Sequence, residues 1–236
     1  MAPESATIRE MFNSISGKYD FLNHFLSFGV DRCWRKKVVQ AIGDHDPGRH
    51  ERLRILDVAT GTGDLAIAIS KLKPSEIRGI DIAPAMLEIA KTKTSGTSAG
   101  KMISFSEAPA ESIPFPDDTF DAVTVAFGVR NFEDLRKGLA EMRRVLKPGG
   151  LMVILEFSQP QSFPFRTLYR IYSRYFIPLA GRLVSGNNEA YTYLPESAAA
   201  FPAGSKFLGI MGECGMRSAR RKELTFGIAS LYTAEK

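Results

Sequence analysis

The stretch from Arg54 to Asp64 constrains the fold of this chain more than any other. It reads RILDVATGTGD, an apolar strand with Asp57 at its end and then a turn that contains Gly61 and Gly63; the helical pattern LAIAIS follows. A buried parallel strand, a glycine turn and a helix N-terminus together form the nucleotide site of α/β proteins. Glycine suits such a turn because it has no Cβ and adopts positive φ without steric cost, so the backbone can lie close to a ligand.

The acidic residues beside these glycines indicate which nucleotide binds. A dinucleotide turn follows the pattern GxGxxG and places a pyrophosphate on the helix N-terminus. Here Asp57 and Asp64 stand on either side of Gly61, Thr62 and Gly63, and their charges would repel a pyrophosphate. They suit a ligand with an amino group, ribose hydroxyls and a positive centre. We therefore expect S-adenosylmethionine here, with its methionine part near the glycine turn.

A second acid supports this interpretation. The run from Ile77 to Asp81 is typical of the next strand, and Asp81 lies 18 residues beyond Gly63. An acid at the end of the second strand binds the ribose hydroxyls in folds of this kind. The alternative is that Asp57 and Asp81 only end strands and cap helices. Two acids at this spacing around a glycine turn favour the binding role.

Length, composition and charge narrow the class of protein. A chain of 236 residues with 44% hydrophobic content is sufficient for one α/β domain with a modest extension. The N-terminal residues lack the basic-then-apolar pattern of a secretion signal. The two cysteines and three histidines show no metal-ligand spacing. We therefore expect a cytoplasmic protein without a bound metal. The net charge of +5 favours anionic partners, either nucleic acid or a membrane surface.

The order of the predicted elements indicates the fold class. Helices are expected within 8–42, interrupted at Gly17 and at 27–29, and then at 63–72, 84–93 and 133–145. Strands are expected at 53–58, 77–81, 102–106, 120–126 and 151–156, with 147–150 as a turn, and a final pair at 216–225 and 227–233. This alternation predicts a seven-stranded, mostly parallel Rossmann-like sheet with helices on both faces and an antiparallel C-terminal hairpin. We expect an N-terminal helical cap over 1–50 and a methyltransferase domain over 51–236.

Residues 157–205 interrupt the alternation and are expected to form a lid on the substrate side. They are rich in aromatic residues, and Arg166, Arg170 and Arg174 recur at every fourth position, on one helix face. One interpretation is a helix that packs on the core with a solvated basic face. The other is an amphipathic surface that touches an anionic membrane and admits a lipid-like substrate.

Several longer motifs resemble one family. Tyr19-Asp-Phe-Leu-Asn23, with Ser27-Phe-Gly29 and Trp34 after it, is similar to the N-terminal signature of the ubiquinone/menaquinone biosynthesis C-methyltransferase family. The segments 144–158 and 127–131, which read RVLKPGGLMVILEFS and FGVRN, also resemble that family, and the similarity extends from about residue 11 to 232. There are departures: Asp31 stands where the family often has His, and Ala126 where some relatives have Ser.

The resemblance implies a reaction and a partner. It implies transfer of a methyl group from S-adenosylmethionine to a ring carbon of a polyprenyl quinol, here demethylmenaquinol, with the benzoquinol of the ubiquinone pathway as the alternative. It also implies that the backbone at Pro109 and Ala110 holds the adenine. Since proline has no amide hydrogen, any donor there is the Ala110 N–H. A polyprenyl substrate would bring the protein into transient contact with the inner face of the membrane.

The chemistry of a quinol suggests which residues act on it. A phenolic hydroxyl has a pKa near 10, so the enzyme has to stabilise the developing anion or remove the proton. Arg130 follows a strand at the ligand-binding edge of the sheet and is the first candidate to hold the oxyanion, with Asn131 beside it. Asp20 is a candidate base. The alternatives are that Arg130 only pairs with Glu133 or Asp134, and that Asp20 caps a helix.

Two other functions share the same fold. The basic charge would suit an RNA methyltransferase, but the sequence has no separate RNA-binding module and no NPPY-like box, so we expect no nucleic-acid partner. A non-catalytic cofactor-binding or assembly protein would not need the glycines, Asp81 and Arg130 together. The sequence leaves the oligomeric state open, and a homodimer is compatible with it.

Overall fold

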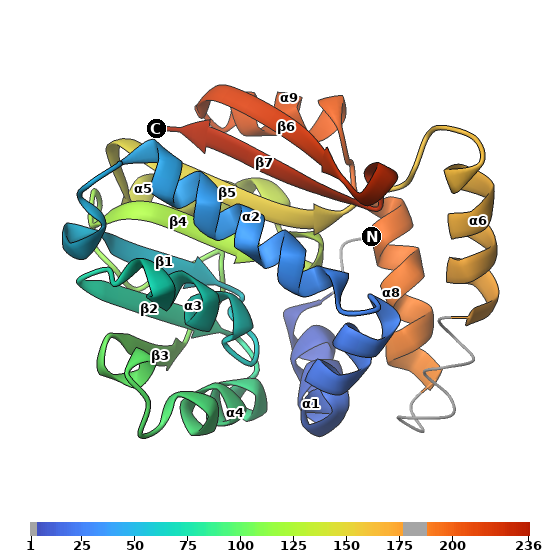
Figure 1. Ribbon diagram of the computed structural model, residues 1–236, viewed down its shortest axis with the longest axis horizontal. Coiled ribbons are helices and arrows are strands. Elements are labelled where there is room, and N and C mark those ends of the chain that lie inside the picture. Colours follow the sequence, from blue (N-terminus) through green and yellow to red (C-terminus); the bar gives the residue numbers. More distant parts are fainter. Residues whose placement is uncertain (1–3, 177–187) are drawn as a thin grey trace.

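The computed structural model describes residues 4–176 and 188–236. Its centre is a seven-stranded sheet with the strand order β3-β2-β1-β4-β5-β7-β6 (Figure 1). The strands are β1 (Arg54–Val58), β2 (Glu76–Asp81), β3 (Ile103–Glu107), β4 (Phe120–Ala126), β5 (Leu146–Phe157), β6 (Arg217–Leu224) and β7 (Ala229–Glu235). The first five are parallel, and β7 pairs antiparallel with both β5 and β6. The predicted fold class is therefore confirmed, including the hairpin.

The helices connect the parallel strands and cover the sheet. They are α1 (Ser5–Leu26), α2 (Val30–His45), α3 (Asp64–Ile69), α4 (Pro84–Thr94), α5 (Leu135–Val145), α6 (Phe165–Ile171), α8 (Asn188–Ala200) and α9 (Ser205–Glu213), and a π-helical turn, Tyr172–Phe176, follows α6. Short 3₁₀ turns lie at His50–Arg52, Ser70–Leu72, Ala99–Lys101, Val129–Asn131 and Thr225–Gly227. No helix among the described residues is both long and apolar enough to cross a membrane.

Alternate residues of the central strands face two separate cores, as the period of two requires. In β5, Met152 and Ile154 contact α5 and α9 on one face. Val153 and Leu155 belong to the opposite core, with Val38 of α2 and residues of α3. Because α2 packs in this layer, it supports the sheet directly, whereas α1 lies over the strand ends.

The structure differs from the predicted elements in two places. Gly17 does not interrupt α1, because Ile15 and Leu22 bury against Ala83 and Met86 at the start of α4. Glycine in a helix costs only about 1 kcal/mol, which tertiary packing overrides. The predicted break at 27–29 is confirmed, with Gly29 at φ +72°.

Strand β5 also begins earlier than expected. The segment 147–150 was predicted as a turn, but pairing with β4 starts at Leu146, opposite Phe120, and resumes after an irregularity at Leu151, opposite Ala122. Gly149 has φ +75° within this irregular part. The proline and glycines therefore produce a bulged strand end, because residues 147–150 lie opposite the single residue Asp121 and the register shifts there.

Three helices gather at the carboxyl ends of the parallel strands. In Figure 1, α1, α6 and α8 lie beyond the arrowheads of β1, β4 and β5. The predicted lid at 157–205 contributes α6 and α8 to this group, and its residues 177–187 lie outside the described part of the chain. Ligands bind at this edge of open α/β sheets.

Candidate active site

The glycine turn after β1 has the backbone that the sequence predicts. Gly61 and Gly63 have φ values of +56° and +79°, where side chains are strained. A Cβ at Gly63 would lie 3.1 Å from the Ala90 Cβ and from the Phe105 ring, whereas nothing lies within 4 Å of a Cβ at Gly61. Gly63 is therefore required by the packing of α4 and β3 on the turn, and Gly61 faces open space.

Asp57 supports this turn from behind. Its buried carboxylate accepts hydrogen bonds from Thr60 Oγ1, at 2.6 Å, and from Thr124 Oγ1, at 2.8 Å. Burial raises the pKa of Asp57 to about 6, against the two hydrogen bonds, which lower it. Asp57 does not line a described cavity, so its contacts are those of a residue that fixes the turn.

Asp81 joins the end of β2 to the same turn. One carboxylate oxygen, Oδ2, accepts the Gly61 N–H at 2.8 Å, and Oδ1 accepts the Ala83 N–H at 2.9 Å. Burial raises the pKa of Asp81, and the backbone hydrogen bonds oppose that shift. Unlike Asp57, Asp81 lines a cavity, so its remaining lone pairs are available to a ligand.

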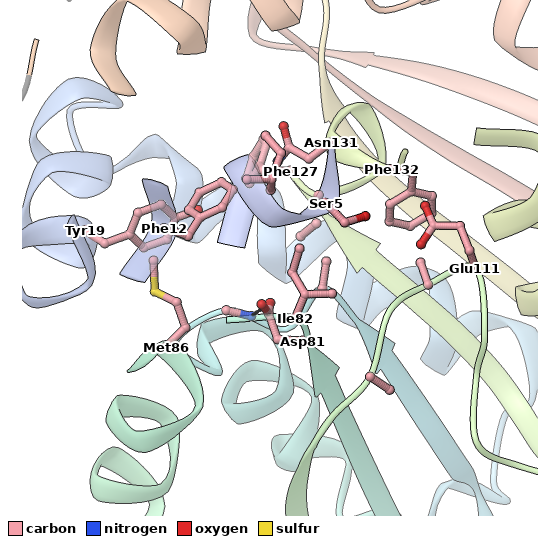
Figure 2. A pocket seen from close by; sticks show the side chains of 17 residues that line it. Ser5, Phe12, Tyr19, Asp81, Ile82, Met86, Glu111, Phe127, Asn131 and Phe132 are labelled. Atoms are coloured by element: carbon pink, nitrogen blue, oxygen red, sulfur yellow. Dashed lines mark hydrogen bonds between the residues drawn. The ribbon is translucent and has the colours of Figure 1, made fainter. Parts of the chain in front are cut away.

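A small cavity lies over these strand ends. Gly61, Asp81, Ala110 and Gly128 form part of its wall, and the helix α1 closes it from outside with Ser5, Ile8, Phe12 and Tyr19. In Figure 2, Phe12 and Tyr19 lie on one side, Phe127 and Asn131 above, and Asp81, Ile82 and Met86 below. Among the other predicted cofactor contacts, Thr62, Gly63 and Pro109 do not line it.

The volume of this cavity, about 60 Å³, is below the roughly 300–1,000 Å³ of ligand pockets. The wall that limits it is α1, which packs on the start of α4 through Ile15 and Leu22 and makes further polar contacts near its first turns. Arg9 pairs with Glu107 at 2.8 Å, Asn13 Oδ1 accepts the Ala85 N–H at 3.1 Å, and Ser5 binds Glu133. The helix α1, which belongs to the expected N-terminal cap, thus forms the outer wall of the small cavity.

A second cavity, of about 310 Å³, lies beside the first. Its wall comes from α1, α2, α6, α8, the ends of β4 and β5 and the turn before β7, and most of the lining side chains are apolar or aromatic. Phe12, Tyr19 and Phe127 line both cavities, so these three side chains form the partition between them. A lipid-like molecule would be accommodated on the apolar side of this partition.

Arg130 lies in the wall of the apolar cavity as one member of a buried ion pair. Its Nη1 lies 2.7 Å from Glu156 Oε1, and the exposed fractions of the two side chains are 4% and 0%. Its Nε donates to Ser197 Oγ at 3.2 Å, and Nη1 also donates to the Phe127 carbonyl. The predicted partners Glu133 and Asp134 are wrong: Glu133 binds Ser5, and Asp134 caps α5 by accepting the Lys137 N–H.

Hydroxyl and amide groups surround this pair. Asn131 lines the small cavity and its Oδ1 accepts a hydrogen bond of 2.9 Å from the Tyr193 hydroxyl, which lines the apolar cavity. Burial raises the pKa values of Tyr19, Tyr169 and Tyr193 above the usual value near 10. These hydroxyls therefore stay protonated at neutral pH and can donate hydrogen bonds to an oxyanion.

Asp20 lies inside α1, so the interpretation of Asp20 as a helix cap is wrong. It accepts a hydrogen bond from Thr62 Oγ1 and pairs with Lys93 Nζ at 2.8 Å. It lines neither cavity. These contacts connect α1 to the glycine turn and to α4.

Next to Asp20 is the one described group of residues that resembles a metal site. His24, Asp31 and Asp64 each place a ligand atom within 4.8 Å of the others. However, Arg35 pairs with both carboxylates, and Lys93 pairs with Asp64. Although burial opposes it, the Ser27 hydrogen bond and the Arg35 guanidinium lower the pKa of Asp31. Two cations already neutralise this group, so it fits an ion-pair network better than a metal.

Sequence reasoning missed Glu156 and Tyr193. Glu156 carried a signal, because it is the only charged residue in the apolar run LMVILEF, and a lone acid in a buried strand requires a partner. Tyr193 carried none beyond its membership of an aromatic-rich segment.

Comparisons with known proteins match the whole chain. The family model described as the ubiE/COQ5 methyltransferase family matches residues 1–236. The chain is 47% identical over 231 residues to the "Ubiquinone/menaquinone biosynthesis C-methyltransferase UbiE" of Geobacter sulfurreducens, covering 97% of this chain and 88% of the relative. It is 44% identical over 234 residues to the "Demethylmenaquinone methyltransferase" of Bacteroides fragilis, covering 99% and 94%.

Solved structures share the fold at low identity. A SAM-dependent methyltransferase of Thermotoga maritima, titled as a possible histamine N-methyltransferase, superposes with a TM-score of 0.64 at 18% identity, covering 96% of this chain and 99% of that one. A methyltransferase structure from Methanococcus maripaludis gives 0.65 at 18% identity, covering 95% and 93%. At this identity, the similarity supports the fold alone.

Proposed function

Since the chain belongs to the ubiE/COQ5 methyltransferase family, we propose that it transfers a methyl group from S-adenosylmethionine to a ring carbon of demethylmenaquinol, giving menaquinol. The observation that carries the proposal is the partition formed by Phe12, Tyr19 and Phe127 between a cavity with an acid-and-glycine wall and a larger apolar cavity. A sulfonium donor on one side and a quinol ring on the other would meet there. Alignment of the two reacting atoms in this way supplies a large part of the rate enhancement in methyl transfer.

The residues of the small cavity fit the donor. Asp81 is fixed by the Gly61 and Ala83 amides and is proposed to accept the ribose hydroxyls, while the Ala110 backbone holds the adenine. In the same wall, Gly128 is required by the packing of the protein itself, because a Cβ there would lie 2.6 Å from the Ala59 Cβ. Thr62 and Asp57 are proposed to act on the turn rather than on the donor. S-adenosylmethionine supplies an electrophilic methyl group on a sulfonium sulfur.

Donor binding would require more space than the small cavity offers. We expect the first turns of α1 to shift outward, since Arg9 and Asn13 attach them to Glu107 and Ala85 by polar contacts. Hydrogen exchange of the α1 amides with and without S-adenosylmethionine would test this expectation. Equal protection in both conditions would contradict it.

On the acceptor side, the chain's task is to stabilise the quinolate oxygen that forms as the quinol hydroxyl gives its proton to water. Electron density from that oxygen drives attack of the ring carbon on the methyl group, S-adenosylhomocysteine leaves, and the ring proton at that carbon is lost to water. Arg130 is proposed to donate to that oxygen, assisted by Asn131. Because Glu156 compensates its charge, Arg130 would act through a directed hydrogen bond rather than through a net positive field. Asp20, bound to Lys93 and Thr62, is proposed to hold α1 on the glycine turn and not to remove the proton.

The substrate suggests where the protein works. A polyprenyl quinol resides in a bilayer, so we propose a cytoplasmic protein that contacts the inner membrane surface. Among the described residues, Arg166, Arg170 and Arg174 are exposed near the apolar cavity, as such contact requires.

The direct test is methyl transfer by the purified chain with labelled S-adenosylmethionine. Reduced demethylmenaquinol with a short prenyl chain should gain one methyl group, detected by mass spectrometry. A polyprenyl benzoquinol and tRNA are the parallel acceptors. A preference for the benzoquinol would replace the proposed substrate with the alternative, and labelling of tRNA alone would reject the proposal. The names of the relatives do not favour the RNA alternative.

A further inference from the structure

Exposed apolar side chains gather at one end of the molecule. Among the described residues, every exposed large apolar side chain belongs to the end of α1 and its turn, to 163–176, or to the turn before β7. The first group is Phe21, Phe25 and Phe28, and the second includes Leu168, Ile171, Tyr175 and Phe176. Phe163 and Phe226 complete the set, which we call the aromatic rim. An exposed apolar patch of this extent marks an interaction surface.

The rim is built from elements that are far apart in the sequence. Phe25 of α1 stacks on Phe176 at 6.3 Å between ring centroids, and Phe28 lies 6.3 Å from the same ring. The Tyr172 hydroxyl, below them, donates to the Leu26 carbonyl. Phe165 stacks on Phe226 at 3.8 Å and extends the contact to the turn before β7. In Figure 1, α6 and the end of α1 lie at the same side of the molecule.

The rim borders the apolar cavity. Phe28 and Leu168 are exposed and also line the cavity, so they continue the apolar surface from inside to outside. Phe28 is 74% exposed. Exposure of an apolar side chain of this size to water is unfavourable in free energy.

The charged residues of α6 and the turns next to it are of one sign. The segment 157–176 contains three arginines and no acidic residue. Arg166, Arg170 and Arg174 are all exposed, and they recur at a spacing that places them on one side of α6 and its π turn, while Leu168, Ile171 and Tyr175 follow another stripe. An aromatic stripe beside arginines is the composition of segments that lie in the interface of anionic bilayers.

From these observations we propose that the aromatic rim inserts into the interface of an anionic lipid bilayer, so that the apolar cavity opens directly to the membrane. The lipid-soluble substrate then enters along a continuous apolar path and does not cross water. This inference rests on the proposed function for the identity of that substrate. The binding surface itself rests on the rim and the arginines, and its partner is the lipid bilayer.

The test measures sedimentation with vesicles of phosphatidylglycerol and phosphatidylcholine. Phe21→Ser with Tyr175→Ser removes two rim side chains that line neither cavity. We expect vesicle affinity to fall about tenfold or more. Arg166→Gln, Arg170→Gln and Arg174→Gln together should weaken binding and reduce its dependence on salt. Pure phosphatidylcholine vesicles should bind the wild type weakly.

A matched control removes the same charge elsewhere. Arg217, Arg220 and Lys222 are exposed on the edge strand β6, and their replacement by glutamine should leave vesicle binding within about twofold of the wild type. The rim variants should methylate a water-soluble short-chain quinol at the wild-type rate, which shows that they are folded, and lose activity only with quinol in vesicles.

Three results would overturn the inference. The first is wild-type protein that stays in the supernatant with anionic vesicles, and the second is a rim variant that binds like the wild type. The third is a concentration-dependent dimer that the rim substitutions abolish, because the rim would then cover a second copy of the chain. A wild type that binds vesicles but methylates no quinol would reject the proposed function and leave the membrane surface standing.

Discussion

Replacing Glu156 by glutamine removes the charge that compensates Arg130 inside the protein. Glu156 Oε1 accepts from Arg130 Nη1 at 2.7 Å and from the Phe157 N–H at 2.8 Å, and Oε2 accepts the Arg130 N–H at 3.3 Å. Glutamine has one acceptor oxygen, and its amide would present hydrogens toward N–H groups. The guanidinium, 4% exposed, would remain charged without a compensating carboxylate.

The expected cost follows from the burial of both groups. Breaking a buried ion pair by removing one partner costs about 3–5 kcal/mol, a large part of the roughly 5–15 kcal/mol that stabilises a typical domain. The entropy of unfolding for a chain of 236 residues is about 0.5 kcal/mol per kelvin at the midpoint. The loss therefore corresponds to a decrease in Tm of about 6–10 °C.

Urea unfolding followed by circular dichroism measures the free energy, and thermal unfolding measures Tm. The control is Arg130→Leu with Glu156→Leu, which removes both charges and fills the space. Because the desolvation cost disappears with the charges, this variant should lose much less stability than Glu156→Gln. A loss below about 1 kcal/mol for Glu156→Gln, or an equally large loss in the double variant, would refute the argument that an uncompensated charge is the cause.

Three other substitutions test separate parts of the structure. Asp81→Asn should weaken S-adenosylmethionine binding by about tenfold or more, since an uncharged amide replaces the acceptor of the ribose hydroxyls; calorimetry measures this, and unchanged affinity would reject the ribose role. Asp57 has a folded pKa of about 6, raised by burial, so the folded state binds its proton more tightly than the unfolded state and loses stability as pH rises from about 4 to 6, by up to about 3 kcal/mol. Unfolding of the wild type should show this decline relative to Asp57→Asn, and parallel pH profiles would contradict it. Gly17→Ala should stabilise the protein by about 0.5–1 kcal/mol, because Gly17 lies inside α1 with nothing within 4 Å of a Cβ, whereas Gly128→Ala should destabilise it, since that Cβ would lie 2.6 Å from the Ala59 Cβ; equal Tm values for the two variants would show that the contact at Gly128 relaxes.

Much of the fold could be predicted from the sequence because the signals are local. The alternation of apolar strands with helices gives a mostly parallel sheet, and the strand, glycines and acid at 54–64 identify the edge where a ligand binds. The break at 27–29 and the final hairpin are also local patterns. These predictions depend on local backbone conformation. The periodicity of the apolar side chains and the positions of the glycines largely determine that conformation.

Contacts between residues that are distant in the sequence could not be predicted in the same way. Asp57 and Asp81 look alike in the sequence, but only the register of β1, β2 and β4 places one on Thr124 and the other beside a cavity. Asp20 reaches Thr62 and Lys93 because α1 lies across the turn and α4. Gly17 remains helical because buried neighbours compensate its cost.

The mostly parallel sheet, the glycine turn and the family motifs are each encoded in short segments of the chain. The pairing of Arg130 with Glu156, the three aromatic rings between the two cavities and the aromatic rim beside the larger one are known only from the folded molecule. Charge compensation and the burial of aromatic rings depend on which distant segments come into contact. No local periodicity encodes these long-range contacts, because they follow from the packing of the whole chain.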